Sequence, residues 1–150
     1  KSYPRSIEAR LSDAELAAIG LERVALIEPE VTPERLLDEA ARHRFALTEG
    51  RVEVDFGSGP VSMPTDGYMR SLIKPLRDDA VANSSFTVSN YRIGPNTYLT
   101  ATADQIIAIY DAVRAHVQAC FAANAAVDTK IADGTYTTIS DVVNALEWPN

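Results

Sequence analysis

The feature of the sequence that most constrains the fold is a long amphipathic pattern over residues 103–132. Apolar side chains recur there in steps of four and three, which is the spacing of one face of an α-helix. Thr102 and Gln105 stand at the spacing of a capping box, and Asp133 and Gly134 supply a stop signal. We therefore predict one helix over residues 103–132. Its inward stripe, with a single polar position, runs through Ile106, Tyr110, Val113, Val117, Cys120, Asn124, Val127 and Ile131.

The stepping of this stripe has two interpretations. A heptad pattern with Asn124 at an a position is typical of a coiled coil, in which a buried Asn fixes register and oligomer state. The stripe would then join copies of the chain in a homo-oligomer, with a trimer favoured. Alternatively, about three heptads also describe one amphipathic core helix that packs across its own sheet. Periodicity alone favours this second interpretation.

Two segments before the long helix have an alternating pattern of period two. In residues 51–63, apolar and charged side chains alternate around a glycine-rich turn, which predicts a β-hairpin. Residues 86–93 and 97–100 are predicted strands around a turn at 94–96. We therefore expect an α+β fold, in which a small antiparallel sheet formed by residues 51–63 and 86–100 packs against the long helix.

Two shorter helices are predicted around the first hairpin. Thr32 is a good cap for a helix over residues 33–47, which has a proline at its first position. Thr65 is a candidate cap for a helix that runs through Leu76. Pro75 should kink or end that second helix, because proline lacks a backbone N–H and clashes with the preceding turn.

Two more short helices are predicted near the ends of the sequence. Ser12 is a good cap for a helix over residues 13–19. Thr138 can cap a helix over residues 139–146, after which Trp148 is expected to pack back on the domain.

Residues 1–31 are expected to form an extended and partly helical arm or adaptor, followed by a compact domain over residues 32–150. Residues 21–27 are apolar and partly β-branched, which indicates a strand or a clamped extended segment. An arm with few core residues can become ordered when it binds a partner, so this segment is a candidate for attachment. Its candidate attachment residues are Tyr3, Ile7, Leu11, Leu16, Ile19, Val24 and Leu26.

Charge and composition narrow the possible partners. The net charge is −7 and the pI is near 4.8, with the basic residues scattered, whereas nucleic-acid binding draws most of its affinity from a basic surface. We therefore predict no nucleic-acid partner. No apolar run approaches the roughly 18 residues of a membrane helix, so no membrane insertion is predicted. The single cysteine excludes a disulfide within the chain and fits assembly in a reducing compartment.

His116 and Cys120 form the nearest approach to a catalytic pair. They stand four residues apart on one face of the predicted helix. A cysteine nucleophile also needs a group that orients its base, and no nucleophile motif surrounds Cys120. The alternative is that Cys120 fills a small core position. The two histidines, His43 and His116, have no zinc-ligand spacing with it. We therefore predict no catalytic residue, no cofactor and no metal.

From about residue 42 onward the chain resembles a phage and prophage domain family, known as the domain of unknown function with the number four-three-seven-six. The resemblance covers roughly two thirds of the chain and rests on structural stretches. Residues 11–21 are also similar to leaders that precede such domains. The matching stretches, in order, are residues 43–50, 51–54, 64–66, 98–109, 115–121 and 132–139. The resemblance implies that His116 and Cys120 belong to the core helix of the family.

Members of this family occur in tail-fibre and other tail proteins, so the resemblance implies a structural component of a bacteriophage tail and not an enzyme. We expect a tail-fibre or baseplate adaptor protein that acts in virion assembly and host attachment. Its expected partners are other phage tail proteins and a host-surface receptor, and its expected location is the virion tail, after assembly in the host cytoplasm. The alternatives are a tail-fibre assembly chaperone that is not retained in the virion and, least favoured, a cysteine hydrolase. A surface of Tyr91, Tyr98 and Tyr136 would bind sugar or serve only for packing.

Overall fold

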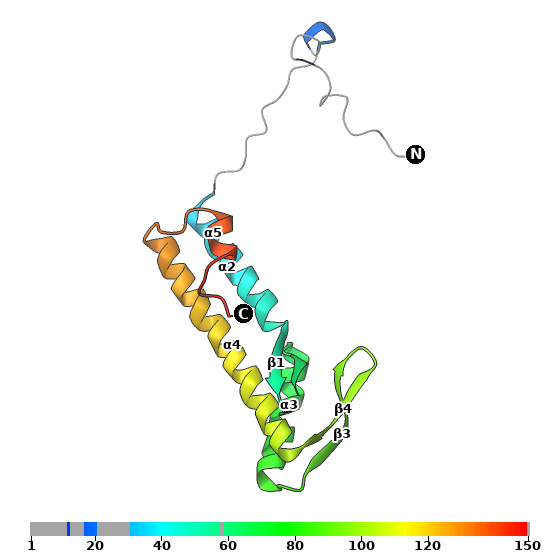
Figure 1. Cartoon of the computed structure of the whole chain (residues 1–150). Coiled ribbons are helices and arrows are strands. Elements are labelled where there is room, and N and C mark those ends of the chain that lie inside the picture. The colour runs from blue at the N-terminus through cyan, green and yellow to red at the C-terminus, as the bar shows by residue number, and fades with distance from the viewer. Residues whose placement is uncertain (1–11, 13–16, 21–30, 58, 150) are drawn as a thin grey trace. The chain divides into compact units, whose positions relative to one another are not determined.

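The computed structural model describes residue 12 and residues 17–20, 31–57 and 59–149. The chain divides into two units, Lys1–Glu30 and Val31–Asn150. The second unit is an α+β domain with two small antiparallel sheets and a long C-terminal helix, as the sequence predicts (Figure 1). Its elements, in chain order, are α2 (Pro33–Thr48), β1 (Arg51–Asp55), β2 (Pro60–Pro64), α3 (Gly67–Ala82), β3 (Thr87–Gly94), β4 (Thr97–Thr102), α4 (Ala103–Ala132) and α5 (Ile139–Val143).

The long helix α4 begins and ends where the sequence predicts. Thr102 Oγ1 accepts a hydrogen bond from the Gln105 backbone N–H at 3.4 Å, and Gln105 Oε1 accepts one from the Thr102 N–H at 3.0 Å. The capping box is therefore confirmed. Asp133 caps the other end, and Gly134 follows with φ +77°. At a rise of 1.5 Å per residue, its 30 residues span about 45 Å, and the other elements pack along this length (Figure 1).

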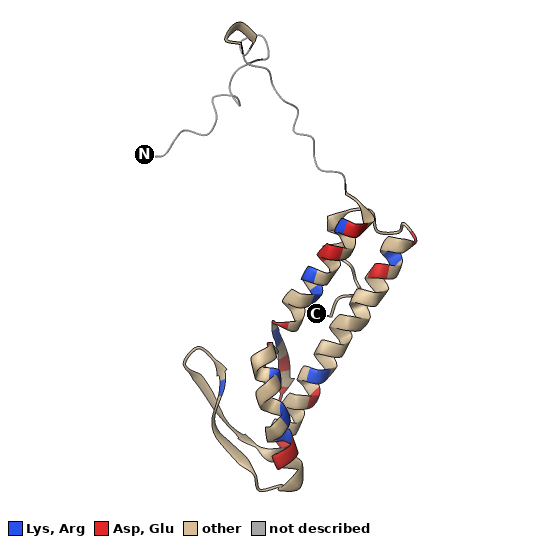
Figure 2. Cartoon of the chain, turned by 180° about the vertical axis from the view of Figure 1, so that it is seen from behind, with Lys and Arg blue, Asp and Glu red and all other residues tan. Residues whose placement is uncertain are grey.

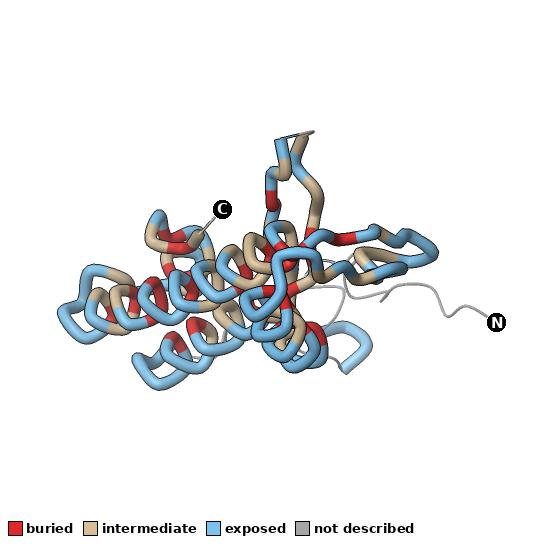
Figure 3. The backbone as a smooth tube through the Cα atoms, turned by 90° about the horizontal axis from the view of Figure 1, so that it is seen from below, coloured by how far each residue is buried: buried red, intermediate tan, exposed pale blue. Residues whose placement is uncertain are grey.

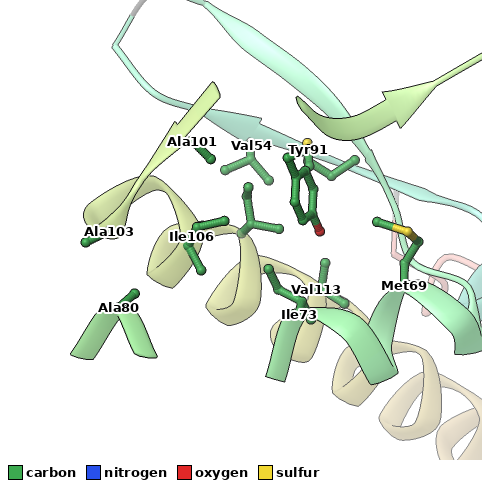
Figure 4. Close-up of a cluster of buried hydrophobic side chains, with 11 residues drawn as sticks. Val54, Met69, Ile73, Ala80, Tyr91, Ala101, Ala103, Ile106 and Val113 are labelled. Carbon is green, nitrogen blue, oxygen red and sulfur yellow. The ribbon is translucent and has the colours of Figure 1, made fainter. Parts of the chain in front are cut away.

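The first half of α4 carries one of two hydrophobic clusters. Ile106, Ile109 and Val113 are buried there against α3, both hairpins and the start of α4 itself. At about 25 cal/mol per Å² of apolar surface, burying side chains of this size contributes roughly 1.5–3 kcal/mol each. The other buried members of this cluster are Val54, Met63, Met69, Ile73, Ala80, Tyr91, Ala101 and Ala103 (Figure 4).

The second half of α4 carries the other cluster. Ala123, Val127 and Ile131 pack against α2, which runs antiparallel to α4, and against the segment from α5 onward (Figure 1). The remaining buried members are Leu36, Ala40, Val142, Ala145 and Trp148. Buried positions recur along α4 through both clusters (Figure 3). One face of one helix therefore serves two cores in series.

The two hairpins do not join into the single sheet that we predicted; they form separate two-stranded sheets. The Thr65 N–H donates to the Gly50 carbonyl oxygen at 3.0 Å. Together with the strand register, this bond shows which residues of β2 direct their backbone polar groups toward β1. By alternation, Pro60, Ser62 and Pro64 direct their backbone polar groups away from β1. Two of these three residues have no N–H to donate. The outer edge of β2 therefore cannot support a continuous ladder with another strand.

The facing strand β3 is also a poor pairing edge. Its register shifts between Val88 and Tyr91 and again between Arg92 and Gly94. Asn90, at the first shift, has φ +58°, a left-handed conformation that only a few per cent of non-glycine residues adopt. The two hairpins are joined by a side chain and not by a ladder of backbone hydrogen bonds. The Arg51 guanidinium donates to Ser62 Oγ at 2.9 Å, to the Ser62 carbonyl oxygen at 2.6 Å and to the Ile93 carbonyl oxygen.

The cap and the end predicted for α3 are both wrong. The cap is Asp66 and not Thr65, because Asp66 Oδ1 accepts the Met69 N–H at 3.0 Å while Thr65 is fully buried. Pro75 does not end the helix, which continues to Ala82. Proline in a helix interior costs about 3 kcal/mol. Burial of Met69 before Pro75 and of Ala80 after it offsets this cost, because both belong to the same core cluster.

The remaining helices follow the prediction more closely. Thr32 caps α2 as predicted, with its side chain accepting the Arg35 N–H at 3.3 Å. Thr138 caps α5, but α5 ends at Val143 and not at residue 146, because the Asn144 side chain bonds back to Ser140 and the chain turns.

The segment after α5 packs back on the domain, as predicted for Trp148. Trp148 Nε1 donates to the Val142 carbonyl oxygen at 2.7 Å. Glu147 accepts hydrogen bonds from Lys130 and, at 2.8 Å, from the Tyr136 hydroxyl. The bond from Lys130, followed by that from Tyr136, lowers the pKa of the Glu147 carboxyl. These contacts attach the C-terminal segment to the end of α4.

Of the predicted N-terminal arm, the structure describes Ser12 and residues 17–20. Gly20 has φ +75° and donates its N–H to the Ala17 carbonyl oxygen at 3.1 Å, which confirms the predicted helix stop. Ile19 is 61% exposed. The strand predicted at residues 21–27 and the other candidate attachment residues, Tyr3, Ile7, Leu11, Leu16, Val24 and Leu26, lie outside the described residues.

Among the described helices, α4 is long and apolar enough to cross a membrane by length and composition, with a mean hydropathy of 1.2 over its most apolar window. This finding differs from the prediction that no apolar run approaches the length of a membrane helix. The helix reaches this hydropathy because alanine fills many of its outward positions, while its large apolar side chains belong to the two clusters. Core helices meet the same criterion, so the property does not by itself indicate a membrane.

The role of Arg51 predicts a difference between two conservative substitutions. Arg51→Lys should lower the free energy of unfolding by about 1–2 kcal/mol, because lysine has no Nε–H for Ser62 Oγ and no planar fork to hold a donor against the Ser62 and Ile93 carbonyl oxygens. The matched control is Arg92→Lys, since Arg92 Nε bonds only the nearby Gly94 carbonyl oxygen at 3.3 Å. That change should stay within about 0.5 kcal/mol. Urea unfolding measures both, and equal losses would contradict the bridging role of Arg51.

Candidate functional site

The candidate functional site is a groove between α3 and β3, here called the α3–β3 groove. It has a volume of about 680 Å³, within the range of about 300–1,000 Å³ that is usual for ligand sites. Tyr68 and Leu72 contribute to the α3 wall, and Val88, Tyr91 and Ile93 contribute to the β3 wall. The lining is mostly apolar. An open groove of this composition has room for an apolar segment or side chain.

The α3 wall exists because this helix is apolar on two faces. Met69 and Ile73 point into the core, whereas Tyr68, Leu72 and Pro75 follow one another at spacings of four and three on an adjacent face. Tyr68 is 71% exposed and Leu72 is 39% exposed. This second face was not predicted from the sequence. Its signal was present in the spacing of Tyr68, Leu72 and Pro75.

The β3 wall takes its form from a bulge. Asn90 adopts the left-handed conformation at the register shift between Val88 and Tyr91. A bulge of this kind re-aims the side chain that follows it. Tyr91 is consequently buried, with its ring among the side chains of the first cluster, and it lines the groove (Figure 4).

Three charged side chains border the groove. Arg51 and Arg92 lie on the side of β3, and Asp66 lies at the start of α3. Asp66 is already engaged as the helix cap. Burial, followed by the nearby Asp66 carboxylate, raises the pKa of Tyr91 to about 12. The Tyr91 hydroxyl is therefore neutral across the physiological range, and the groove combines an apolar floor with two guanidinium groups along one edge.

His116 and Cys120 do meet, but not as a base and a nucleophile. His116 Nε2 lies 3.1 Å from the Leu47 carbonyl oxygen and 3.6 Å from Cys120 Sγ. A carbonyl oxygen can only accept, so Nε2 carries the proton and has no lone pair for the thiol. Cys120 is fully buried, and burial raises the pKa of its thiol. This arrangement is that of a core cysteine beside a histidine that links α4 to α2.

The predicted oligomerisation stripe lies within the chain's own core. Ile106, Val113, Cys120, Val127 and Ile131 are buried, and Tyr110 and Val117 are half-buried. Asn124 is also buried, and its Nδ2 donates to Asp128 Oδ1 at 2.8 Å in the same chain. The interpretation in which this helix packs across its own domain therefore describes the stripe. Association through these residues would require the chain to give up its own core contacts.

The other sequence-based candidates are dispersed. Tyr91 is buried beside the groove, Tyr98 is 57% exposed on β4, and Tyr136 bonds Glu147 beyond the end of α4. These tyrosines therefore form no common surface. Within residues 12, 17–20, 31–57 and 59–149, no group of three or more His, Cys, Asp or Glu side chains is placed to hold a metal ion.

Fold and groove together define a small α+β domain, built on one long helix, with a preformed apolar groove on one side. The family model described as "Domain of unknown function (DUF4376)" matches residues 31–145. The chain belongs to this family, and the resemblance to the domain with that number is confirmed. Comparison with curated proteins and with solved structures gives no match.

The environment of Cys120 predicts an unreactive thiol. Because the side chain is fully buried and its thiol pKa is raised, a disulfide reagent at pH 8 should modify the folded protein at least about tenfold more slowly than the urea-unfolded chain. The rate of thiol modification is measured by absorbance. Faster reaction in the folded state would contradict the assignment of Cys120 to the core and would support the hypothesis that Cys120 is a nucleophile.

Tyr91 predicts a loss of stability at alkaline pH. Its folded pKa of about 12 lies above the unfolded value near 10, so its stabilising effect is complete below pH 10 and is lost as the pH rises from 10 to 12. The loss should be on the order of 2–3 kcal/mol. Tyr91→Phe should remove this part of the pH dependence in urea unfolding between pH 9 and 12. An unchanged profile would show that Tyr91 ionises as freely in the folded chain as in the unfolded one.

Proposed function

We propose that this chain is a structural component of a bacteriophage tail, a tail-fibre or baseplate adaptor protein that acts in virion assembly and host attachment. The proposal rests on the resemblance to phage domains in the sequence and on one structural observation, the preformed α3–β3 groove. The groove would receive an apolar segment of another tail protein. The protein would be made in the host cytoplasm and would reside in the virion tail.

The groove has the composition of a protein-binding surface. Tyrosine and arginine are enriched where proteins meet, and exposed anchors in a pocket supply most of the binding energy. Tyr68 and Leu72 are exposed anchors on a helix that is held in place from its other face. A rigid wall keeps down the cost of ordering the surface on binding.

The guanidinium groups narrow the chemistry of the partner. Arg51 holds its position through Ser62 and Ile93, while Arg92 is exposed along the same edge. An apolar segment flanked by acidic residues fits this arrangement, because it would fill the floor and place carboxylates near both arginines. The N-terminal residues 1–31 would provide a second attachment.

A single substitution in the groove tests this proposal. Leu72→Arg should reduce the number of copies of the protein in purified particles by at least about tenfold, because it places a charge where an apolar segment has to pack. The matched control is Val81→Arg, on the same helix, since Val81 is 58% exposed and does not line the groove. Quantitative mass spectrometry of particles measures copy number.

The same measurement separates the two classes of phage protein. A structural component appears in parent particles at a fixed copy number. Absence of the unchanged protein from mature particles would contradict that role and favour the alternative of an assembly chaperone. Equal incorporation of Leu72→Arg and the parent would contradict the groove as the docking site.

A further inference from the structure

The outer face of α4 lacks the charges that an exposed helix face normally carries. From residue 115 to residue 127 the sequence contains no Lys, Arg, Asp or Glu. Figure 2 shows this uncharged stretch of α4 from behind. Phe121, near its middle, is 53% exposed. Helices that face water carry polar and charged residues on that side, so this surface has the character of an interface.

The neighbouring helix α2 extends the same surface. Its Arg44 guanidinium lies 4.4 Å from the centre of the Phe121 ring, which places both side chains on one side of the helix pair. Leu37 stands seven residues before Arg44, on the same face of α2, and is 40% exposed. Ala125 stands one turn beyond Phe121 and is exposed. We call these four residues, Leu37, Arg44, Phe121 and Ala125, the Phe121 face.

The charges at the ends of this surface are arranged symmetrically. Arg114 stands seven residues before Phe121, and Asp128 stands seven residues after it, so all three lie along one strip of α4. Within the described residues no ion pair or hydrogen bond holds Arg114, which lines a hollow of about 270 Å³ beside Arg70 and Lys74. The strip is thus basic at one end, aromatic in the middle and acidic at the other end.

Such a strip is complementary to itself when it is reversed. A two-fold axis relates the same surface on two copies, so a residue on one side of the axis faces a residue on the other side. If the two-fold axis lies beside Phe121, Arg114 of each copy faces Asp128 of the other copy. The two residues cannot pair within one chain, because fourteen residues of helix separate them by about 21 Å.

We propose that the Phe121 face joins two copies of this chain around a two-fold axis beside Phe121. The α4 helices run antiparallel across the interface, and Arg114 of each copy pairs with Asp128 of the other copy. The buried stripe of α4 stays inside each copy. The pairing does not depend on a role in phage tails, since it follows from the surface alone. Four helices, α2 and α4 from each copy, form the contact.

Burial at the interface strengthens this charge pairing. Asp128 is already partly desolvated in the single chain, and this burial raises the pKa of its carboxyl despite the hydrogen bond from Asn124 and the nearby charge of Arg44. A carboxylate in such a place gains from a further cation. Arg70, Lys74 and Arg114 gather at the position that Asp128 of the second copy would approach.

Light scattering over a range of concentrations gives the first test. The parent protein should pass from monomer to dimer as concentration rises. Phe121→Lys should weaken the dimer by at least about tenfold, because it removes the aromatic ring at the symmetry axis and adds a second cation beside Arg44. The control is Tyr98→Lys, since Tyr98 on β4 is similarly exposed at 57% and lies outside the Phe121 face. A parent that stays monomeric throughout would overturn the proposal, as would equal dimerisation of Phe121→Lys and the parent.

A mixing experiment tests the geometry. Arg114→Asp alone sets two acids against each other at both ends of the dimer, and Asp128→Arg alone sets two bases. Each variant should dimerise at least about tenfold more weakly than the parent. A one-to-one mixture restores an opposite-charge pair at both ends, so the mixture should form a heterodimer with near-parental affinity. Circular dichroism and urea unfolding identify which variants are folded. A mixture of folded variants that stays monomeric would overturn the antiparallel arrangement.

Discussion

Burial of one face of α4, from Ile106 to Ile131, is the interaction on which the unit Val31–Asn150 depends. The other elements of this unit each cover a part of that face. The first part is covered by α3 and the hairpins, and the second by α2 and the segment from α5 onward. Neither cluster is large. A helix of 30 residues lets both share one rigid element, so neither has to order a complete core of its own.

The groove exists because the two hairpins do not pair into one sheet. Had β2 and β3 paired, the edge of β3 would have been occupied by another strand. Pro60 and Pro64 remove donors from the edge of β2, and Asn90 breaks the regularity of β3. Arg51 then joins the two sheets through carbonyl oxygens at a fixed separation. The edge strands avoid open-ended pairing with other chains, and the space beside α3 stays open.

Local signals in the sequence were sufficient for much of this structure. Periodicity and caps predict α4, α2 and both hairpins, because each of these elements is defined by residues a few positions apart. The cap of α3 was missed because Thr65 and Asp66 are both good caps, and only the core decides which of them is buried. Pro75 was misjudged for a related reason, since burial on both sides of it overrides local propensity.

The groove could not be predicted in the same way, because its walls, α3 and β3, meet only through the fold. The inward stripe shows the opposite limit. Its spacing suits both a coiled coil and a core helix. Which of the two forms depends on whether the rest of the chain can cover the stripe, and a local pattern does not show this. Asn124 illustrates this point, since within the chain its side chain donates a hydrogen bond to Asp128 one turn away.

The division of α4 into two successive clusters also bears on how a family built on this domain can diversify. The residues that shape the groove share their packing with the first cluster, and Trp148, Val142 and Leu36 belong to the second. Changes that remodel the groove are therefore absorbed within one cluster and leave the packing of the other intact. A change in what the groove accepts therefore need not alter the packing at the far end of the helix, where the closing segment of the chain is held.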